Sequence, residues 1–91
     1  MDHVVIVPPP EIDVATAPEL ASRLAAVDVG AQVVVDFTEV DFCDSSGLGV
    51  LVVAYNRQHH GGGGVVINNV REPIRQLFEV AGLASRLLAD V

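Results

Sequence analysis

The segment Asp44–Gly49, with the sequence Asp-Ser-Ser-Gly-Leu-Gly, carries the residues best suited to chemistry. Two adjacent hydroxyl groups, Ser45 and Ser46, follow a carboxylate and precede a run in which apolar residues recur at helical spacing. The segment therefore predicts a helix N-terminus, where free backbone N–H groups and the helix dipole favour an anion. A serine there is either a helix cap or an acceptor of phosphate, and the local sequence leaves both interpretations open.

Nucleophilic catalysis by these serines has little support. A nucleophile elbow needs glycine two positions before and two positions after the serine, and Ser45 has only the second of these. His59 and His60 lie at the far end of the same predicted helix, about 20 Å away at a rise of about 1.5 Å per residue, and nothing marks His3 as a base. No P-loop or dinucleotide fingerprint is present, so we expect no enzymatic activity and no cofactor.

A metal site is the second alternative. Three aspartates, Asp13, Asp36 and Asp44, could form a divalent-cation site of the response-regulator kind, but such a site is ordinarily assisted by a lysine and the chain has none. Asp36 fits better as the end of a strand, and Asp44 as a cap for the serine helix. His59 and His60 project about 100° apart on a helix, which disfavours a shared ion. We therefore expect no metal.

Composition predicts one small domain that spans residues 1–91. The chain is 51% apolar, with a mean hydropathy of +0.47, and a lone cysteine, Cys43, is expected to be a buried small hydrophobe. Twelve acidic residues against five arginines give a net charge of −7, which disfavours nucleic acid and anionic membranes and favours a basic partner. Without a membrane-spanning stretch or a basic signal sequence, the chain is expected in the cytoplasm.

The elements that must position the serines alternate between strand and helix. Strands are predicted over His3–Val7, Gln32–Phe37 and Val65–Ile67, and helices from Thr16 to about Val27, from about Ser46 to about His59 and from near Pro73 to Ala81. Thr16 and Glu19 match a capping box, and Gly82-Leu83 matches a Schellman ending. The long crossovers require parallel strands, so the pattern predicts an α/β fold with about three helices. The segment 85–91 is predicted as a last strand or strand fragment.

Four stretches of the chain match a known family: Glu11–Leu20, Val34–Phe37, Val40–Gly49 with its Asp-Ser-Ser-Gly-Leu-Gly core, and Pro73–Leu83. Through them, residues 4–88 resemble the STAS domains of bacterial anti-sigma factor antagonists. It implies a STAS-like fold with a small, mostly parallel sheet. The family's usual first strand and last helix find no room in this chain, so we expect an uncovered sheet edge and a homodimer that covers it.

The resemblance also implies partner switching. In the family the serine directly after the aspartate, here Ser45, is phosphorylated by an anti-sigma factor that is itself a serine kinase, and a PP2C-type phosphatase reverses the reaction. The unphosphorylated domain binds the anti-sigma factor and thereby frees the sigma factor. The residues carried over as partner contacts are Asp13, Asp44, Ser46, Gly47 and Gly49.

Two other STAS functions remain open at this point. Related STAS proteins are subunits of lipid-transport ATPase complexes, which dock through the same helix surface without phosphorylation, and other modules bind ligands or partners. The near-complete Asp-Ser-Ser-Gly-Leu-Gly core favours the antagonist. Phosphate on Ser45 adds about −1.5 to −2 charges at pH 7. Beside Asp41 and Asp44, that charge is expected to weaken a docked complex by several kcal/mol, which is enough to switch binding on or off.

Overall fold

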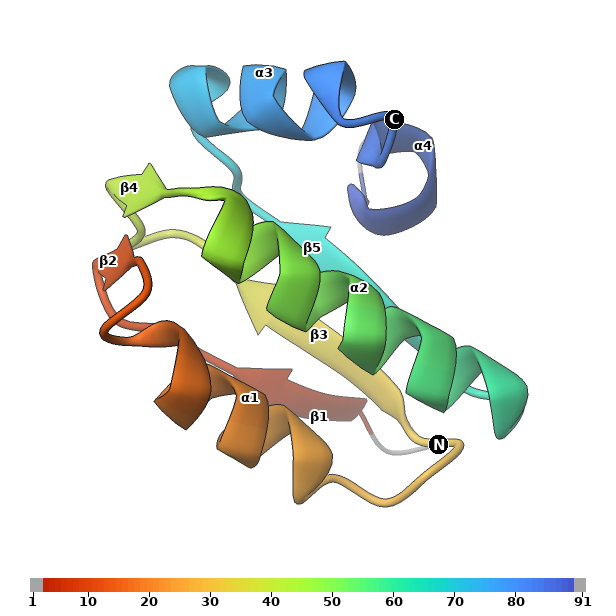
Figure 1. Cartoon of the computed structure of the whole chain (residues 1–91). Helices are drawn as coiled ribbons and strands as arrows, with labels where there is room; N and C mark the ends of the chain where they lie inside the picture. Colours follow the sequence, from red (N-terminus) through yellow and green to blue (C-terminus); the bar gives the residue numbers. More distant parts are fainter. Residues whose placement is uncertain (1–2, 90–91) are drawn as a thin grey trace.

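Three parallel strands form the main sheet of the computed structural model, which describes residues 3–89 (Figure 1). The strands are β1 (His3–Ile6), β3 (Gln32–Asp36) and β5 (Gly64–Asn68), in the spatial order β1-β3-β5. Valine dominates all three, because a branched side chain packs well on a pleated surface. Both pairings are parallel, which confirms the prediction made from the long crossovers.

A second ladder joins two very short strands that the sequence did not predict. β2 (Glu11–Ile12) pairs in parallel with β4 (Phe42–Cys43), so that Ile12 lies opposite Cys43. With two residues per strand, this ladder is too short to give an alternating pattern in the sequence.

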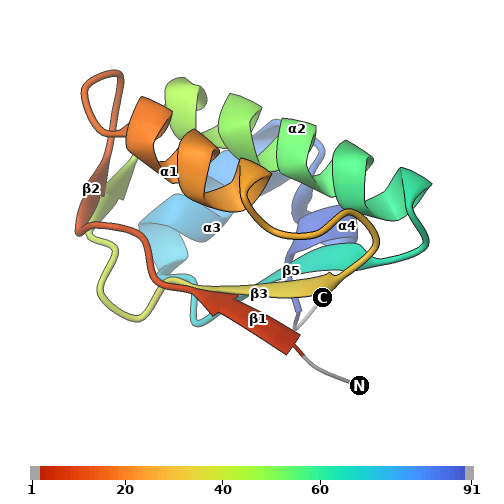
Figure 2. The same cartoon turned by 90° about the horizontal axis from the view of Figure 1, so that it is seen from below.

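Within residues 3–89, helices cover one face of the main sheet and leave the other uncovered, as Figure 2 shows. α1 (Ala17–Ala25) and α2 (Ser45–His60) lie side by side on this face, with α3 (Glu72–Val80) and α4 (Ala84–Leu87) beyond α2 (Figure 1). On the uncovered face Val5, Val34 and Val66 lie in register, and Val5 is 59% exposed. Within residues 3–89 no strand pairs with the outer edge of β1, and its coverage by self-association stays a prediction.

The end of the described chain corrects one prediction. Residues 84–87 form the fourth helix, α4, where a strand was expected from residue 85. After it, Leu88 makes an isolated parallel bridge with Ile67, and the N–H of Ala89 donates to the Ile67 carbonyl at 3.0 Å. The strand fragment is thus confirmed at Leu88 alone, while residues 90 and 91 of the predicted segment lie outside the described residues.

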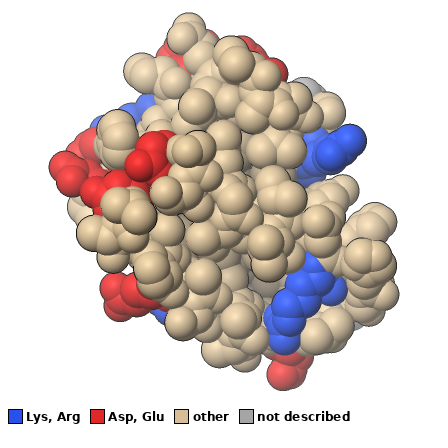
Figure 3. Space-filling model, viewed as in Figure 1, with Lys and Arg blue, Asp and Glu red and all other residues tan. Residues whose placement is uncertain are grey.

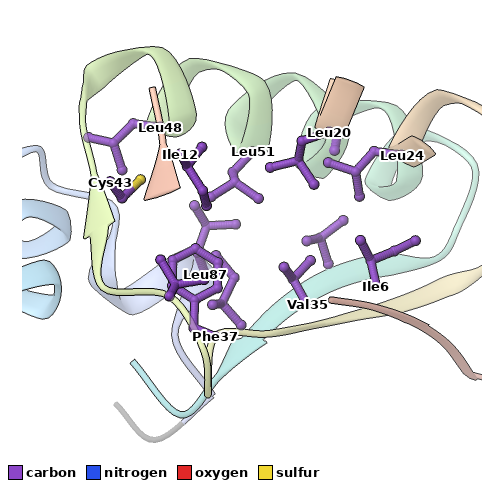
Figure 4. Packing of buried hydrophobic residues seen from close by; sticks show 14 of the residues in the cluster. Ile6, Ile12, Leu20, Leu24, Val35, Phe37, Cys43, Leu48, Leu51 and Leu87 are labelled. Atoms are coloured by element: carbon purple, nitrogen blue, oxygen red, sulfur yellow. The ribbon is translucent and has the colours of Figure 1, made fainter. Parts of the chain in front are cut away.

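The core lies between the helices and the covered face of the sheet (Figure 4). The helical spacing of apolar residues predicts burial of Leu20, Leu24 and Val27 for the first helix, and all three are buried. For the second helix it predicts Leu48, Leu51, Val52 and Tyr55, of which Leu48 and Leu51 are buried and the other two half-buried. For the third helix it predicts Ile74, Leu77, Phe78 and Ala81: Ile74 and Phe78 are buried, Leu77 is half-buried and Ala81 is exposed. Phe78 meets Phe37 edge to face with ring centroids 6.1 Å apart.

Thr16 is the N-cap of α1 with Pro18 in the first turn, as predicted, but the side-chain bond of a capping box is absent. Thr16 makes no side-chain cap bond; its hydroxyl instead donates to the Glu11 carbonyl at 2.8 Å. The turn before α1 is closed by Asp13, whose Oδ1 accepts from the N–H of Ala15 at 2.9 Å and of Thr16 at 3.1 Å. The Schellman ending of α3 is confirmed, because the Leu83 N–H donates to the Phe78 carbonyl at 2.9 Å.

A buried amide fixes the far end of α2. Gln58 is 2% exposed, and its Nε2 donates to the carbonyls of Asp28 at 2.8 Å and Ala31 at 3.0 Å. Arg57 donates both to the Val27 carbonyl and to Oε1 of Gln58. These bonds satisfy every buried polar atom of the Gln58 side chain and hold α2 against the loop that follows α1. These contacts at the C-terminal end of α2 help to set the direction of the helix, and with it the position of its first turn.

Candidate functional site at the start of helix α2

Asp44 is the N-cap of α2. Its backbone is extended, with φ −111° and ψ −170°, and its Oδ1 accepts from the N–H of Ser46 at 2.9 Å. Its carbonyl accepts from the N–H groups of Gly47 and Leu48. The prediction that Asp44 caps the serine helix is therefore confirmed, and the alternative in which a serine is the cap is wrong.

Ser45 is the first residue of α2 and is exposed to solvent. Within residues 3–89 its hydroxyl has no hydrogen-bond partner, whereas the next serine, Ser46, is half-buried and has its N–H bonded to the cap. The fold thus makes no use of the Ser45 hydroxyl. Of the two candidate acceptors, Ser45 is the more exposed.

The two glycines of this turn have different surroundings. Gly47 is buried, and a Cβ atom there would lie 2.6 Å from the Cys43 Sγ and 2.7 Å from the Ile12 Cγ2. The absence of a side chain lets α2 pack directly on the β2–β4 ladder. Gly49 is exposed, and a Cβ there would meet nothing within 4 Å. Packing therefore requires Gly47, but nothing in the described fold requires Gly49.

The β2–β4 ladder brings Asp13 next to the cap. Asp13 directly follows β2 and Asp44 directly follows its partner strand β4. The pairing continues past the strands, since the N–H of Asp44 donates to the carbonyl of Ile12 at 3.1 Å. Glu11 and Asp41 are exposed close by, and Asp41 forms an ion pair with Arg71. Figure 3 shows acidic side chains gathered over this end of the molecule. The surroundings of Ser45 are therefore acidic, as the net charge of the chain suggested.

Two apolar side chains on this surface were missed in the sequence. Phe42 on β4 is 49% exposed, and Val14, in the loop after β2, is 77% exposed. An alternation of apolar and polar residues could have predicted that Phe42 is exposed and Cys43 buried, but a strand of two residues gives no such pattern. Exposed apolar side chains inside a charged surface are typical of protein docking sites.

Cys43 behaves as the buried small hydrophobe that was expected. It is 7% exposed, and burial raises the pKa of its thiol from 9.0 to about 11, with a further contribution from the Asp44 carboxylate. We predict that the native thiol reacts with a disulfide reagent at pH 8 about a hundredfold more slowly than in urea, because only the thiolate attacks. Absorbance of the released thiol measures both rates; equal rates would show that Cys43 is open to solvent.

Of the aspartates in the metal alternative, Asp13 and Asp44 follow the paired strands β2 and β4, whereas Asp36 is bonded in a local structure of its own. Asp36 ends β3, and the pKa of its carboxyl is lowered by hydrogen bonds from the side chain of Asn69 and from Thr38. His59 stacks on Tyr55, with ring centroids 5.6 Å apart. Within residues 3–89, no three potential ligand side chains lie close enough to share an ion.

A protein-family model described as Mlab, STAS domain, matches residues 9–89 of the chain. The chain belongs to the STAS domain family. Among curated STAS relatives, the anti-sigma-B factor antagonist of Listeria monocytogenes is 35% identical over 85 residues, which are 91% of this chain and 75% of that protein. The anti-sigma-B factor antagonist of Bacillus subtilis is 35% identical over 74 residues, covering 80% of this chain and 68% of that one.

Solved structures show that the STAS fold extends over nearly the whole chain. Unphosphorylated SpoIIAA, an anti-sigma factor antagonist, superposes with a TM-score of 0.81 at 22% identity, covering 97% of this chain and 80% of that one. The phosphorylated form of Bacillus SpoIIAA gives 0.72 at 22% identity, with 96% and 82% covered. The STAS-like fold expected from the sequence is therefore confirmed. No helix of this STAS domain within residues 3–89 has the length and apolar character needed to span a membrane.

Proposed function

We propose that this STAS domain is an anti-sigma factor antagonist of the cytoplasm, without catalytic activity of its own. The unmodified domain binds an anti-sigma factor that is a serine kinase, and this binding frees the sigma factor. The kinase phosphorylates Ser45, the complex dissociates, and a PP2C-type phosphatase restores the hydroxyl. The proposal is supported by the curated relatives. The observation that carries it is an exposed hydroxyl with no intramolecular partner within residues 3–89, at the first position of α2.

The chemistry at Ser45 is a phosphoryl transfer supplied by the kinase and its ATP. The Ser45 Oγ bonds to the γ-phosphorus as the bond from that phosphorus to the β–γ bridging oxygen breaks. ADP leaves, and the hydroxyl proton passes to a base on the kinase. The domain contributes position: Asp44 and the β2–β4 ladder fix the first turn, so that Ser45 Oγ is presented on a rigid element.

The first turn of α2 leaves little to neutralise the new charge. The N–H groups of Ser46, Gly47 and Leu48 already donate to the side chain and carbonyl of Asp44. The helix dipole favours the phosphate, but these donors are not free to bind it. Phosphate therefore adds negative charge to a surface that already holds Asp13, Asp41 and Asp44. A docked partner would have to bury this charge, which lowers the affinity.

The partner-contact residues form a compact surface around Ser45. Asp13 and Asp44 lie at the edge of this surface beside the β2–β4 ladder, and Ser46 and Gly49 lie on α2. Gly47 is buried and allows α2 to pack closely against the ladder. We include Val14 and Phe42, whose exposed apolar surface a partner would cover. The acidic rim fits a basic partner surface.

The test is phosphorylation by the cognate anti-sigma factor kinase with ATP. Mass spectrometry is expected to place one phosphate on Ser45. Ser45→Ala is expected to remain bound to the kinase and unlabelled, and Ser46→Ala, the matched control one residue away, is expected to be labelled like the native chain. Labelling of Ser46 instead would contradict the residue assignment. Co-purification with a transporter ATPase, and no phosphorylation, would favour the transport-subunit alternative.

A further inference from the structure

The chain between β2 and α1 presents an apolar tip beside the candidate site. We call residues Asp13–Thr16 the β2–α1 turn. Within it Val14 is 77% exposed, and the next residue, Ala15, is exposed as well. Figures 1 and 2 show this part of the chain projecting at the end of the molecule that holds the first turn of α2. The core gains little from a side chain so exposed, so packing does not explain the position of Val14.

Hydrogen bonds close the β2–α1 turn, and the Thr16 hydroxyl joins its two ends. This hydroxyl donates to the carbonyl of Glu11 on β2 at 2.8 Å and accepts from the N–H of Asp13 at 2.9 Å. The N–H of Thr16 donates to the Asp13 carbonyl at 3.1 Å, and the Asp13 carboxylate accepts from the N–H groups that follow it. A turn bonded at both ends has few alternative conformations, so Val14 is held in one place.

The Thr16 hydroxyl serves this turn and not the helix that follows. Thr16 is the N-cap of α1, but its side chain makes no cap bond. The N–H of Ala17, the first residue of α1, donates instead to the Asp13 carbonyl at 2.8 Å. Removing the hydroxyl therefore leaves the hydrogen bonds of α1 in place and loosens the turn before it.

The β2–α1 turn is attached to the same ladder that positions Ser45. Ile12 of β2 lies opposite Cys43 of β4, and the next residue of each strand begins the turn on one side and caps α2 on the other. The apolar tip and the first turn of α2 are therefore parts of one surface. Glu11 is exposed on it and Asp13 is half-buried. A partner surface that places an apolar side chain among basic ones fits both the tip and these carboxylates.

We infer that Thr16 is a positioning residue for docking: its hydroxyl holds the β2–α1 turn in the conformation that the anti-sigma factor kinase binds, and Val14 is the side chain that the turn presents. This inference rests on the proposed function and deepens it. A loop that is ordered before contact loses less conformational entropy on binding than a loop that becomes ordered on contact. The hydrogen bonds of Thr16 thus raise the affinity for the kinase, through a side chain that the core does not need.

The free domain gives the first test, without any kinase. Backbone order parameters from nitrogen-15 relaxation are expected to be about 0.85 over the β2–α1 turn of the native chain and below about 0.6 in Thr16→Val, which lacks the hydroxyl. Thr16→Ser, which keeps the hydroxyl, is expected to match the native chain. Low order parameters in the native turn would overturn the inference whether or not the kinase binds.

Titration with the kinase gives the second test. Thr16→Val is expected to weaken binding by about tenfold, because the kinase must then order the turn itself. Thr16→Ser is expected to stay within about twofold of the native affinity. Thr38→Val is the matched control and is expected to bind like the native chain. It removes the chain's other threonine hydroxyl, which donates to Asp36 at 2.6 Å at the end of β3.

A double-mutant cycle separates positioning from a merely structural role. Val14→Ala is expected to weaken binding by about tenfold in the native chain but by at most about threefold in Thr16→Val, where the turn no longer presents the side chain. Losses that multiply would overturn the inference, and so would native affinity of Thr16→Val while Ser45 is still phosphorylated. A native chain that the kinase neither binds nor labels would instead refute the proposed function, and this inference with it.

Discussion

Replacing Ser45 with aspartate is expected to lower the affinity for the anti-sigma factor kinase by about a hundredfold or more, equivalent to roughly 3 kcal/mol. The physical reason is that docking buries the new carboxylate beside Asp44 and Asp13, at a first turn whose N–H groups are already bonded. The same change is expected to leave the isolated domain as stable as before, or more stable by about 0.3–1 kcal/mol, because a negative charge favours a helix N-terminus. The affinity for the kinase thus falls, while the free energy of unfolding stays the same or rises.

Isothermal titration with the kinase and urea unfolding of the free domain measure the two effects. Ser85→Asp is the matched control, since Ser85 is also exposed and also lies in the first turn of a helix, α4. It adds the same charge away from the site and is expected to leave the kinase affinity unchanged. Unchanged affinity of Ser45→Asp would show that charge at this position does not control docking, and the proposed switch would fail.

The second large effect is expected from alanine at the two glycines of the site. Gly47→Ala is expected to lower the free energy of unfolding by about 1–3 kcal/mol, because its Cβ overlaps Cys43 and the buried Ile12. Gly49→Ala is expected to raise it by about 0.5–1 kcal/mol, because the added methyl meets nothing and alanine favours the helix. The same substitution two residues apart therefore changes stability with opposite sign.

Urea unfolding followed by circular dichroism measures both variants, each serving as the control for the other. If Gly49 contacts the kinase, Gly49→Ala also binds it more weakly in spite of its greater stability, which separates a docking residue from a folding residue. Equal losses of stability in the two variants would contradict the packing described for the first turn of α2.

The start of α2 was predictable from the sequence because several local signals agree there. Apolar side chains at helical spacing begin at Leu48, four residues after Asp44, and aspartate is among the best N-cap residues. The structure follows both signals, with Leu48 and Leu51 buried and the Asp44 carboxylate bonded to the Ser46 N–H. The parallel sheet was predictable for a topological reason, since strands separated by a helix can pair only through long crossovers.

Other features depend on contacts between segments distant in sequence, and local patterns miss these. A nearer contact already defeats one local pattern: Thr16 matches a capping box, but its hydroxyl donates to the carbonyl of Glu11 on β2, five residues earlier. The β2–β4 ladder exists because Ile12 and Cys43 meet across the chain, and neither segment is long enough to show a strand period. The acidic surface around Ser45 and the exposure of Phe42 follow from that same ladder. The position of Ser45 at the start of α2 could thus be predicted, but its surroundings could not.

The parallel register of the main sheet also has a consequence for how this chain reaches its native state. His3 pairs with Gln32, and Gln32 pairs with Gly64, so successive partners are 29 and 32 residues apart. No pair of strands in this sheet can form as a hairpin. Each pairing first requires the closure of a long loop, which costs conformational entropy before any contact between the strands stabilises it. Refolding is therefore expected to be slower than in helical bundles of similar size. During synthesis, β1 has no strand to pair with until β3 has emerged from the ribosome, so its edge stays open to other chains in the meantime.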